Sequence, residues 1–165
     1  MESPQQFFDA FVRRSYDEWL QAPTDLLRAS CAIHQANVMV ERVVRYECRA
    51  KSLSAGQFNV EVRKRLEYLA IESSDFALVR DLDDAHKHLE LTRPSQPPRQ
   101  LTKADQTYVE ETGGYGGSAY GEEPYGGANA EVVVRLDNGS LRPLALILKN
   151  IIQMCESKLL GISRR

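Results

Sequence analysis

The stretch DLLRASCAIHQANVMVERVVRYECR, residues 25–49, decides the fold. Its apolar residues recur around most of the surface of a helix, and a helix of that kind is normally central and covered by its neighbours. Thr24 is the predicted N-cap, and Asp25 in the first turn suits the positive end of the helix dipole. The rest of the chain must therefore supply the elements that cover this helix.

Three further helices are predicted around it from their apolar periodicity. The first begins with a capping-box pattern at Ser3 and Gln6. The last is capped by Ser73 or Ser74 and cannot continue through Pro94. The four predicted helices span residues 4–21, 25–49, 57–71 and 75–91.

The C-terminal third predicts a different structure. Residues 101–112 contain a candidate strand, and residues 131–136, EVVVRL, are β-branched and predict another. Asn138-Gly139 predicts a hairpin turn, because these residues readily adopt positive φ. Pro143 then opens a last helix over residues 144–160, which Gly161 closes.

The predicted fold class is mainly α, with a four-helix bundle followed by a β-hairpin and a C-terminal helix. At 165 residues the chain suits one domain. Within it we assign residues 4–92 to the bundle, 93–130 to a Pro/Gly/Tyr-rich loop and 131–162 to the hairpin and last helix. Seven of the fifteen residues in 113–127 are glycine, so we expect this segment to be the most mobile.

Composition points to a soluble protein of the cytoplasm. Net charge is −2, so no overall field recruits nucleic acid or membrane. No apolar run approaches the ~20 residues that cross a bilayer, and the N-terminal residues do not resemble a signal peptide. Three cysteines without a CxxC spacing argue against a disulfide framework or zinc knuckle. We expect no membrane contact and no cofactor.

Common catalytic motifs are missing from the sequence, namely GxSxG, the P-loop, GxGxxG after a strand, and HExxH. Charge is nevertheless segregated, with a basic stretch over residues 42–65 and an acidic one over 67–84. This pattern suits either an anion-binding region or ordinary solvated helix faces.

One polar stripe lies on the central helix, where five residues follow at intervals of 4, 3, 4 and 4 and so share a face. Buried polar groups are costly without partners, which makes the stripe a candidate binding site. The alternative is a face exposed to solvent. The stripe consists of Ser30, His34, Asn37, Glu41 and Arg45.

A second stripe lies on the fourth predicted helix. Asp81, Asp84 and His88 share a face there, with Arg80 one turn before Asp84. Together with His34, Asn37 and Glu41, Asp84 completes the predicted binding set. The alternative is an ordinary helix whose residues form i,i+4 pairs, Asp83 with Lys87 and Asp84 with His88.

The segment from Arg80 to His88 resembles the signature of HEPN domains, small helical bundles common in bacterial toxin and defence systems. Their pattern is Arg, a polar residue, a few residues and then His, and Arg80-Asp81 followed by His86 fits it. His88 departs from the usual spacing. The chain is also similar to uncharacterised bacterial proteins in which an RDxxDAxKH-type helix precedes a strand-turn-strand and a helix.

The resemblance implies a metal-independent ribonuclease with its site at a homodimer interface. Its catalytic residues would be Arg80, Asp81, His86 and His88. Either histidine could act as general acid or base, and Arg80 could stabilise the charge that develops on the phosphate. The carboxylates of Asp81 or Asp84 could orient these groups. The basic stretch could hold the RNA backbone if it folds beside this helix.

Three functions compete on the sequence alone. The first is a bacterial or phage-type interaction protein without enzymatic activity, with an immunity or regulatory role and a protein partner. The second is the HEPN-like ribonuclease, whose partner is RNA. The third is a metal-binding helical bundle with His34, Asp84 and His88 as ligands, since an i,i+4 Asp/His pair can chelate one ion.

Overall fold

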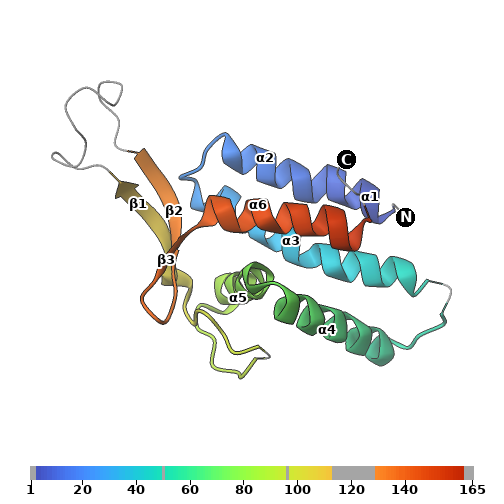
Figure 1. Cartoon of the computed structure of the whole chain (residues 1–165). Coiled ribbons are helices and arrows are strands. Elements are labelled where there is room, and N and C mark those ends of the chain that lie inside the picture. The colour runs from blue at the N-terminus through green and yellow to red at the C-terminus, as the bar shows by residue number, and fades with distance from the viewer. Residues whose placement is uncertain (1–2, 50, 96, 113–128, 162–165) are drawn as a thin grey trace.

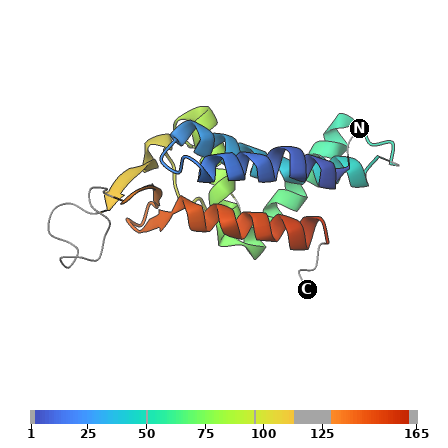
Figure 2. The ribbon, with the colours of Figure 1, turned by 90° about the horizontal axis from the view of Figure 1, so that it is seen from above.

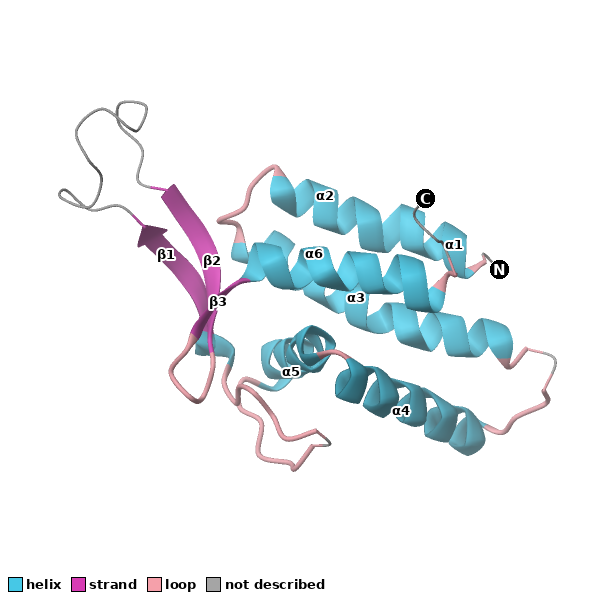
Figure 3. Cartoon of the chain, in the orientation of Figure 1, coloured by secondary structure: helices cyan, strands magenta, loops and turns pink. Residues whose placement is uncertain are grey.

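Helices dominate the computed structural model, which describes residues 3–49, 51–95, 97–112 and 129–161. They make up 65% of the described residues, and a small antiparallel sheet lies at one end of the helical body (Figures 1 and 3). The predicted mainly α fold class is therefore confirmed. The segment 113–127, predicted to be mobile, lies outside the described residues.

The N-terminal helical rod has three parts, of which the middle one is π-helical. The predicted capping box is confirmed at its start, where Ser3 Oγ accepts a hydrogen bond from Gln6 N at 3.2 Å. In return Gln6 Oε1 accepts one from Ser3 N at 2.8 Å. The parts are α1 (Pro4–Phe7), η1 (Phe8–Arg13) and α2 (Arg14–Leu20).

Helix α3 (Leu26–Glu47) is central, as its apolar circumference predicts. It contacts α1, α2, α4, α5 and α6. Its N-cap is Asp25 rather than the predicted Thr24, because the Asp25 carboxylate accepts hydrogen bonds from the backbone N–H groups of Leu27 and Arg28. A charged acceptor also interacts favourably with the helix dipole, which explains why it takes the position.

Two helices follow α3 along the lower side of Figure 1. Helix α4 (Ala55–Glu72) starts earlier than predicted, because Ser54 and Gln57 form a second capping box. Helix α5 (Ser74–His88) is capped by Ser73 and ends three residues before the predicted end. It is seen end-on in Figure 1, and it lies between α3, α4 and α6, all of which it contacts.

The sheet has the strand order β1-β2-β3, with both pairs antiparallel. Its strands are β1 (Thr107–Thr112), β2 (Asn129–Arg135) and β3 (Leu141–Pro143). The predicted hairpin turn joins β2 to β3, with Gly139 at φ +85°. A short 3-10 turn, η2 (Ala104–Gln106), precedes β1.

The last helix joins the sheet to the helical body. It consists of α6 (Leu144–Met154) and the π-helical η3 (Cys155–Leu159), and the positive φ of Gly161 follows it, as predicted. The view from above shows α2 and α6 running alongside α3, with the sheet at one end (Figure 2). Val132 and Val134 of β2 pack in the same core cluster as Ile33 and Ile147. Among the described residues no helix is both long and apolar enough to span a membrane.

Candidate functional site

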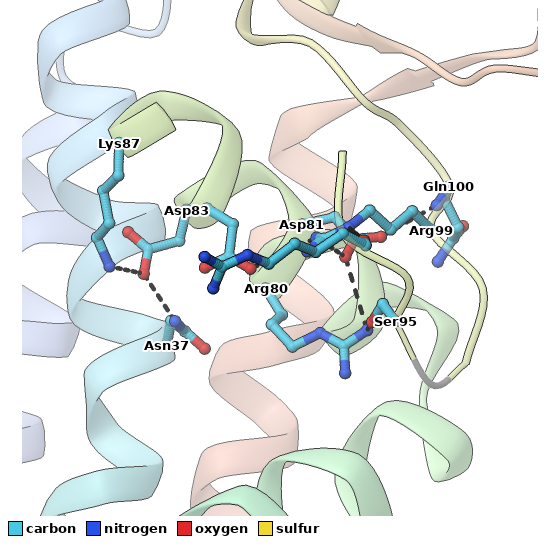
Figure 4. A network of polar contacts seen from close by, with 10 residues as sticks. Asn37, Arg80, Asp81, Asp83, Lys87, Ser95, Arg99 and Gln100 are labelled. Atoms are coloured by element: carbon cyan, nitrogen blue, oxygen red, sulfur yellow. Dashed lines mark hydrogen bonds and ion pairs between the residues drawn. The ribbon is translucent and has the colours of Figure 1, made fainter. Parts of the chain in front are cut away.

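Helix α5 carries charged side chains in the interior of the protein, where charged groups are rarely found without partners. Asp81 is fully buried, Asp83 is 3% exposed and Arg80 is 9% exposed. Successive residues on a helix point in different directions, so these three side chains reach different neighbours. Figure 4 shows Asp83 on the side of α3, and Asp81 and Arg80 on the side of the loop that follows α5.

Asp83 joins α5 to the polar stripe of α3. Its carboxylate accepts a hydrogen bond from Asn37 Nδ2 at 2.7 Å and lies 3.0 Å from His34 Nδ1. Lys87 Nζ contacts the same carboxylate at 2.6 Å, which is the predicted i,i+4 pair. Burial by itself would raise the pKa of Asp83, but the hydrogen bonds from Lys87, Asn37 and His34 outweigh it, so the pKa lies below its ordinary value.

Asp81 joins α5 to the loop over residues 89–103. Its carboxylate lies 3.0 Å from Arg99 Nη1 and accepts a hydrogen bond from Gln100 N at 3.0 Å. Arg80 Nη2 is 3.6 Å away. Burial raises the pKa of Asp81, an effect that the Gln100 N–H and the two guanidinium groups reduce without cancelling. We nevertheless assign Asp81 as ionised near neutral pH, because it has a direct ion pair with Arg99.

The two residues of the HEPN-like pattern face different parts of the protein. Arg80 Nη2 donates to Ser95 Oγ at 2.5 Å in the loop (Figure 4), whereas His86 Nδ1 lies 3.1 Å from Ser30 Oγ of α3. Six positions along a helix correspond to about 120° of rotation, which accounts for the separation. Burial lowers the pKa of His86, and the charge of Asp83 opposes this only in part. The structure therefore does not bring Arg80 and His86 together within one chain.

Arg80, Asp84 and His88 follow at intervals of four residues along α5 and line two adjoining cavities, Arg80 and Asp84 the first, Asp84 and His88 the second. The two cavities, of about 290 and 550 Å³, share Asp84 and Pro94 in their linings, and we treat them together as one surface. We call it the α5–loop groove. It is lined by Arg63, Leu66 and Glu67 of α4, by Arg80, Asp84 and His88 of α5, and by Glu90, Leu91, Thr92, Arg93, Pro94, Ser95 and Arg99 of the loop.

The loop side of this groove begins at a strained residue. Leu89 ends α5 with φ +61° and ψ −41°, a conformation that side chains with a Cβ rarely adopt. Glu90 N bonds to His88 O at 2.7 Å across it, which forms a γ-turn. Backbone hydrogen bonds from Ala104 N to Leu89 O and from Leu91 N to Thr102 O then join the two ends of the loop. The turn folds the loop back along α5 and opposite Asp84.

The residues predicted as metal ligands have other partners. His34 contacts Asp83 rather than Asp84, and Asp84 lies 3.4 Å from Arg99 Nη1. Within residues 3–49, 51–95, 97–112 and 129–161 no group of three or more His, Cys, Asp or Glu side chains could hold a metal ion. The predicted trio of His34, Asp84 and His88 is therefore not assembled, because the two helices meet through Asp83, one position away on α5.

The polar stripe of α3 is divided between two neighbours. Ser30, His34 and Asn37 face α5, whereas Arg45 pairs with Glu41 at 2.7 Å and stacks on Phe58 of α4. The first half of the stripe therefore combines contacts with α5 and partial exposure to solvent, since the side chain of His34 is 44% exposed. Of the basic stretch over residues 42–65, Arg63 lines the α5–loop groove.

The loop residues of the groove were missed by sequence reasoning, which found no periodicity in residues 92–100. Arg99 is the clearest case, because it is 14% exposed and bridges Asp81 and Asp84. A usable signal did exist in the sequence. Asp81 follows apolar Val79 by two residues and precedes Leu82 on a helix that must be buried, so it required a cation from elsewhere. No protein-family model, curated protein or solved structure matches this chain.

Proposed function

We propose that the protein is a non-enzymatic interaction protein with a regulatory or immunity role, and that it binds a protein partner through the α5–loop groove. The observation that carries this proposal is the charge composition of the groove, which contains basic and acidic side chains in nearly equal number. The basic side chains are Arg63, Arg80, Arg93 and Arg99, and the acidic ones are Glu67, Asp84 and Glu90.

A balanced pattern suits a polypeptide and not a polyanion. RNA would approach the carboxylates of Glu67, Asp84 and Glu90, and desolvating like charges against phosphate is unfavourable. A peptide with both signs of charge can pair with both kinds of side chain. The groove also has the size of a recognition site, because clefts of roughly 300–1,000 Å³ are typical for bound ligands.

Three of the residues considered for catalysis have structural partners, which further supports a binding role. Arg80 bonds to Ser95, Asp81 to Arg99 and Gln100, and His86 to Ser30. A general base must reach a substrate proton, and side chains held in these contacts would have to break them first. The arrangement favours positioning of the loop over chemistry.

The binding proposal is tested with charge reversals on the exposed rim of the groove. Proteins captured by the wild type are identified, and each is then purified and titrated against the chain by calorimetry. The double variant Glu90→Lys/Arg93→Glu should weaken the binary complex at least tenfold, whereas Lys149→Glu on α6 should leave it unchanged. The proposal fails if no captured protein binds as a purified component, or if the groove variant binds as well as the control.

A metal-independent ribonuclease is the second candidate function. One observation favours it, namely that Arg80 and His88 line adjoining cavities on either side of Asp84, from which both could reach one phosphate group. His88 would then be the general acid or base instead of His86. By resemblance to HEPN domains, a second copy of the chain would complete the site.

The ribonuclease candidate is tested by incubating single-stranded RNA with the protein and a chelator. If the protein is a ribonuclease of this kind, the wild type and the His86→Asn variant cleave the RNA, and the Arg80→Ala and His88→Ala variants do not. Equal inactivity of all four proteins, at concentrations where a dimer would form, removes the candidate. Cleavage that depends on Arg80 and His88 would replace the interaction proposal.

A further inference from the structure

A second hollow lies away from α5, between the C-terminal part of α3 and the N-terminal part of α4. It has a volume of about 540 Å³. We call it the α3–α4 trough. It is lined by Glu41, Arg45 and Cys48 of α3 and its C-cap, by Arg49, Lys51, Ser52 and Leu53 of the connection, and by Ala55, Phe58, Asn59 and Val62 of α4.

The lining of the trough is basic although the whole chain has a net charge of −2. It contains Arg45, Arg49 and Lys51 against a single carboxylate, Glu41. Arg45 is paired with that carboxylate at 2.7 Å. In the described part of the chain no ion pair joins Arg49 or Lys51 to a carboxylate within 4.0 Å. Glu61 lies near enough to Lys51 for the ammonium charge to help lower the pKa of that carboxyl, but Glu61 does not line the trough.

Aromatic rings hold the two arginines of the trough in place. The guanidinium carbon of Arg45 lies 4.6 Å from the centre of the Phe58 ring, and that of Arg49 lies 5.6 Å from the centre of the Tyr46 ring. A guanidinium stacked on a ring keeps its N–H donors at the edge free for acceptors, and it has already lost part of its side-chain entropy. Both effects favour binding of a phosphate, which accepts such donors in pairs.

Apolar side chains form the other part of the trough. Leu53, Phe58 and Val62 are each partly buried and line it together with the basic residues. A hollow with cationic and apolar parts suits a small molecule that carries a phosphate at one end and a planar or apolar group at the other. We propose that the α3–α4 trough binds a nucleoside phosphate, with the phosphate held by Arg49 and Lys51 and the nucleoside placed against Leu53, Phe58 and Val62.

Glu41 competes for Arg45 in this arrangement. While the Glu41–Arg45 pair persists, Arg45 presents only part of its donors to a ligand. Removal of the carboxylate releases those donors and removes a like charge from beside the phosphate. Glu41→Ala should therefore bind the ligand more tightly than the wild type, which is the opposite of what a structural role for the pair would produce.

Isothermal titration calorimetry of the full chain with AMP and ATP tests the proposal. Adenosine and inorganic phosphate, which each represent one part of the proposed ligand, are titrated for comparison. We expect both nucleotides to bind, and adenosine and inorganic phosphate each to bind at least tenfold more weakly. Arg49→Glu and Lys51→Glu should each weaken nucleotide binding by about tenfold, as expected for loss of one charge-assisted contact. Lys149→Glu, an equal change of charge at an exposed position of α6, should have no effect.

Cys48 provides a second readout, because it lines the trough. Cys31 is exposed and is removed by Cys31→Ser, and Cys155 is buried with its pKa raised to about 12, so Cys48 remains the reactive thiol. Alkylation of Cys48 should slow when AMP is present. The proposal is overturned if neither nucleotide binds, if binding leaves Cys48 unprotected, or if single-stranded oligonucleotides bind while both mononucleotides do not.

Discussion

Asn37 of α3 donates a hydrogen bond to the buried carboxylate of Asp83 on α5 at 2.7 Å. The two residues are 46 positions apart in the sequence, and together with His34 and Lys87 they fix how the two helices meet. On the other side of α5, Asp81 and Arg99 fix the loop. The same helix therefore positions both the bundle and the groove through two neighbouring carboxylates.

Replacement of Asp83 should destabilise the protein. Asp83→Ala leaves Asn37 and His34 without their acceptor at a helix interface, and we expect a loss of about 2 kcal/mol in the free energy of unfolding. Lys87→Ala removes a half-exposed partner of the same carboxylate and should cost about 0.5 kcal/mol. Urea denaturation measures both. Equal stability of the two variants would show that Asp83 does not anchor α5.

Arg99 should control the order of the loop. Arg99→Ala leaves the fully buried Asp81 with Gln100 N and the more distant Arg80, and we expect a cost of about 2–3 kcal/mol. Amide hydrogen exchange over residues 91–103 should accelerate more than exchange in α6. Arg93→Ala, in which an exposed arginine of the same loop is lost, is the matched control and should leave exchange unchanged. An identical exchange pattern in both variants would contradict this role for Arg99.

His86 should make the stability of the protein depend on pH. Burial lowers its pKa below the ordinary 6.5, so the unfolded chain binds a proton at a pH where the folded chain does not. The stability that His86 contributes is present above pH 6.5 and is lost as the pH falls through that value toward the lower pKa of the folded state.

His86→Asn should therefore flatten the change in melting temperature between about pH 7.5 and pH 5. The pKa of Asp83 is also lowered, but its contribution is lost only below the ordinary 3.8 and so lies outside this range. The pKa of Glu61 is lowered from an ordinary 4.5 by its hydrogen bond with Lys64, so its contribution to stability is also lost below this pH range. A variant that melts with the same pH dependence as the wild type would rule out His86 as the group that titrates.

Replacement of Leu89 by glycine should stabilise the protein. Its side chain is 75% exposed, so little packing is lost, and glycine adopts positive φ without the clash that a Cβ creates. We expect Leu89→Gly to raise the free energy of unfolding by about 0.5–1 kcal/mol. Leu89→Ala keeps the Cβ and should show no gain. Thermal melting compares the two, and a gain in both or in neither would refute strain at this turn.

The sequence by itself determined the local features of the fold. The capping box of Ser3 and Gln6, the cap of α5 at Ser73 and the turn at Gly139 each depend on hydrogen bonds or dihedral angles within four residues. The apolar circumference of α3 likewise depends only on its own residues, and it correctly indicated a central helix. Such features can be predicted because every interacting group is present in one short segment.

Tertiary structure alone decided which residues form the candidate site. Helical periodicity placed His34 and Asn37 on one face of α3, but it could not specify that Asp83, 49 positions from His34, would meet that face instead of Asp84. It also could not place Arg99 against Asp81, because a loop has no period. A shift of one residue on a helix turns a side chain by about 100°, and only the packing of α5 between its neighbours settles that angle.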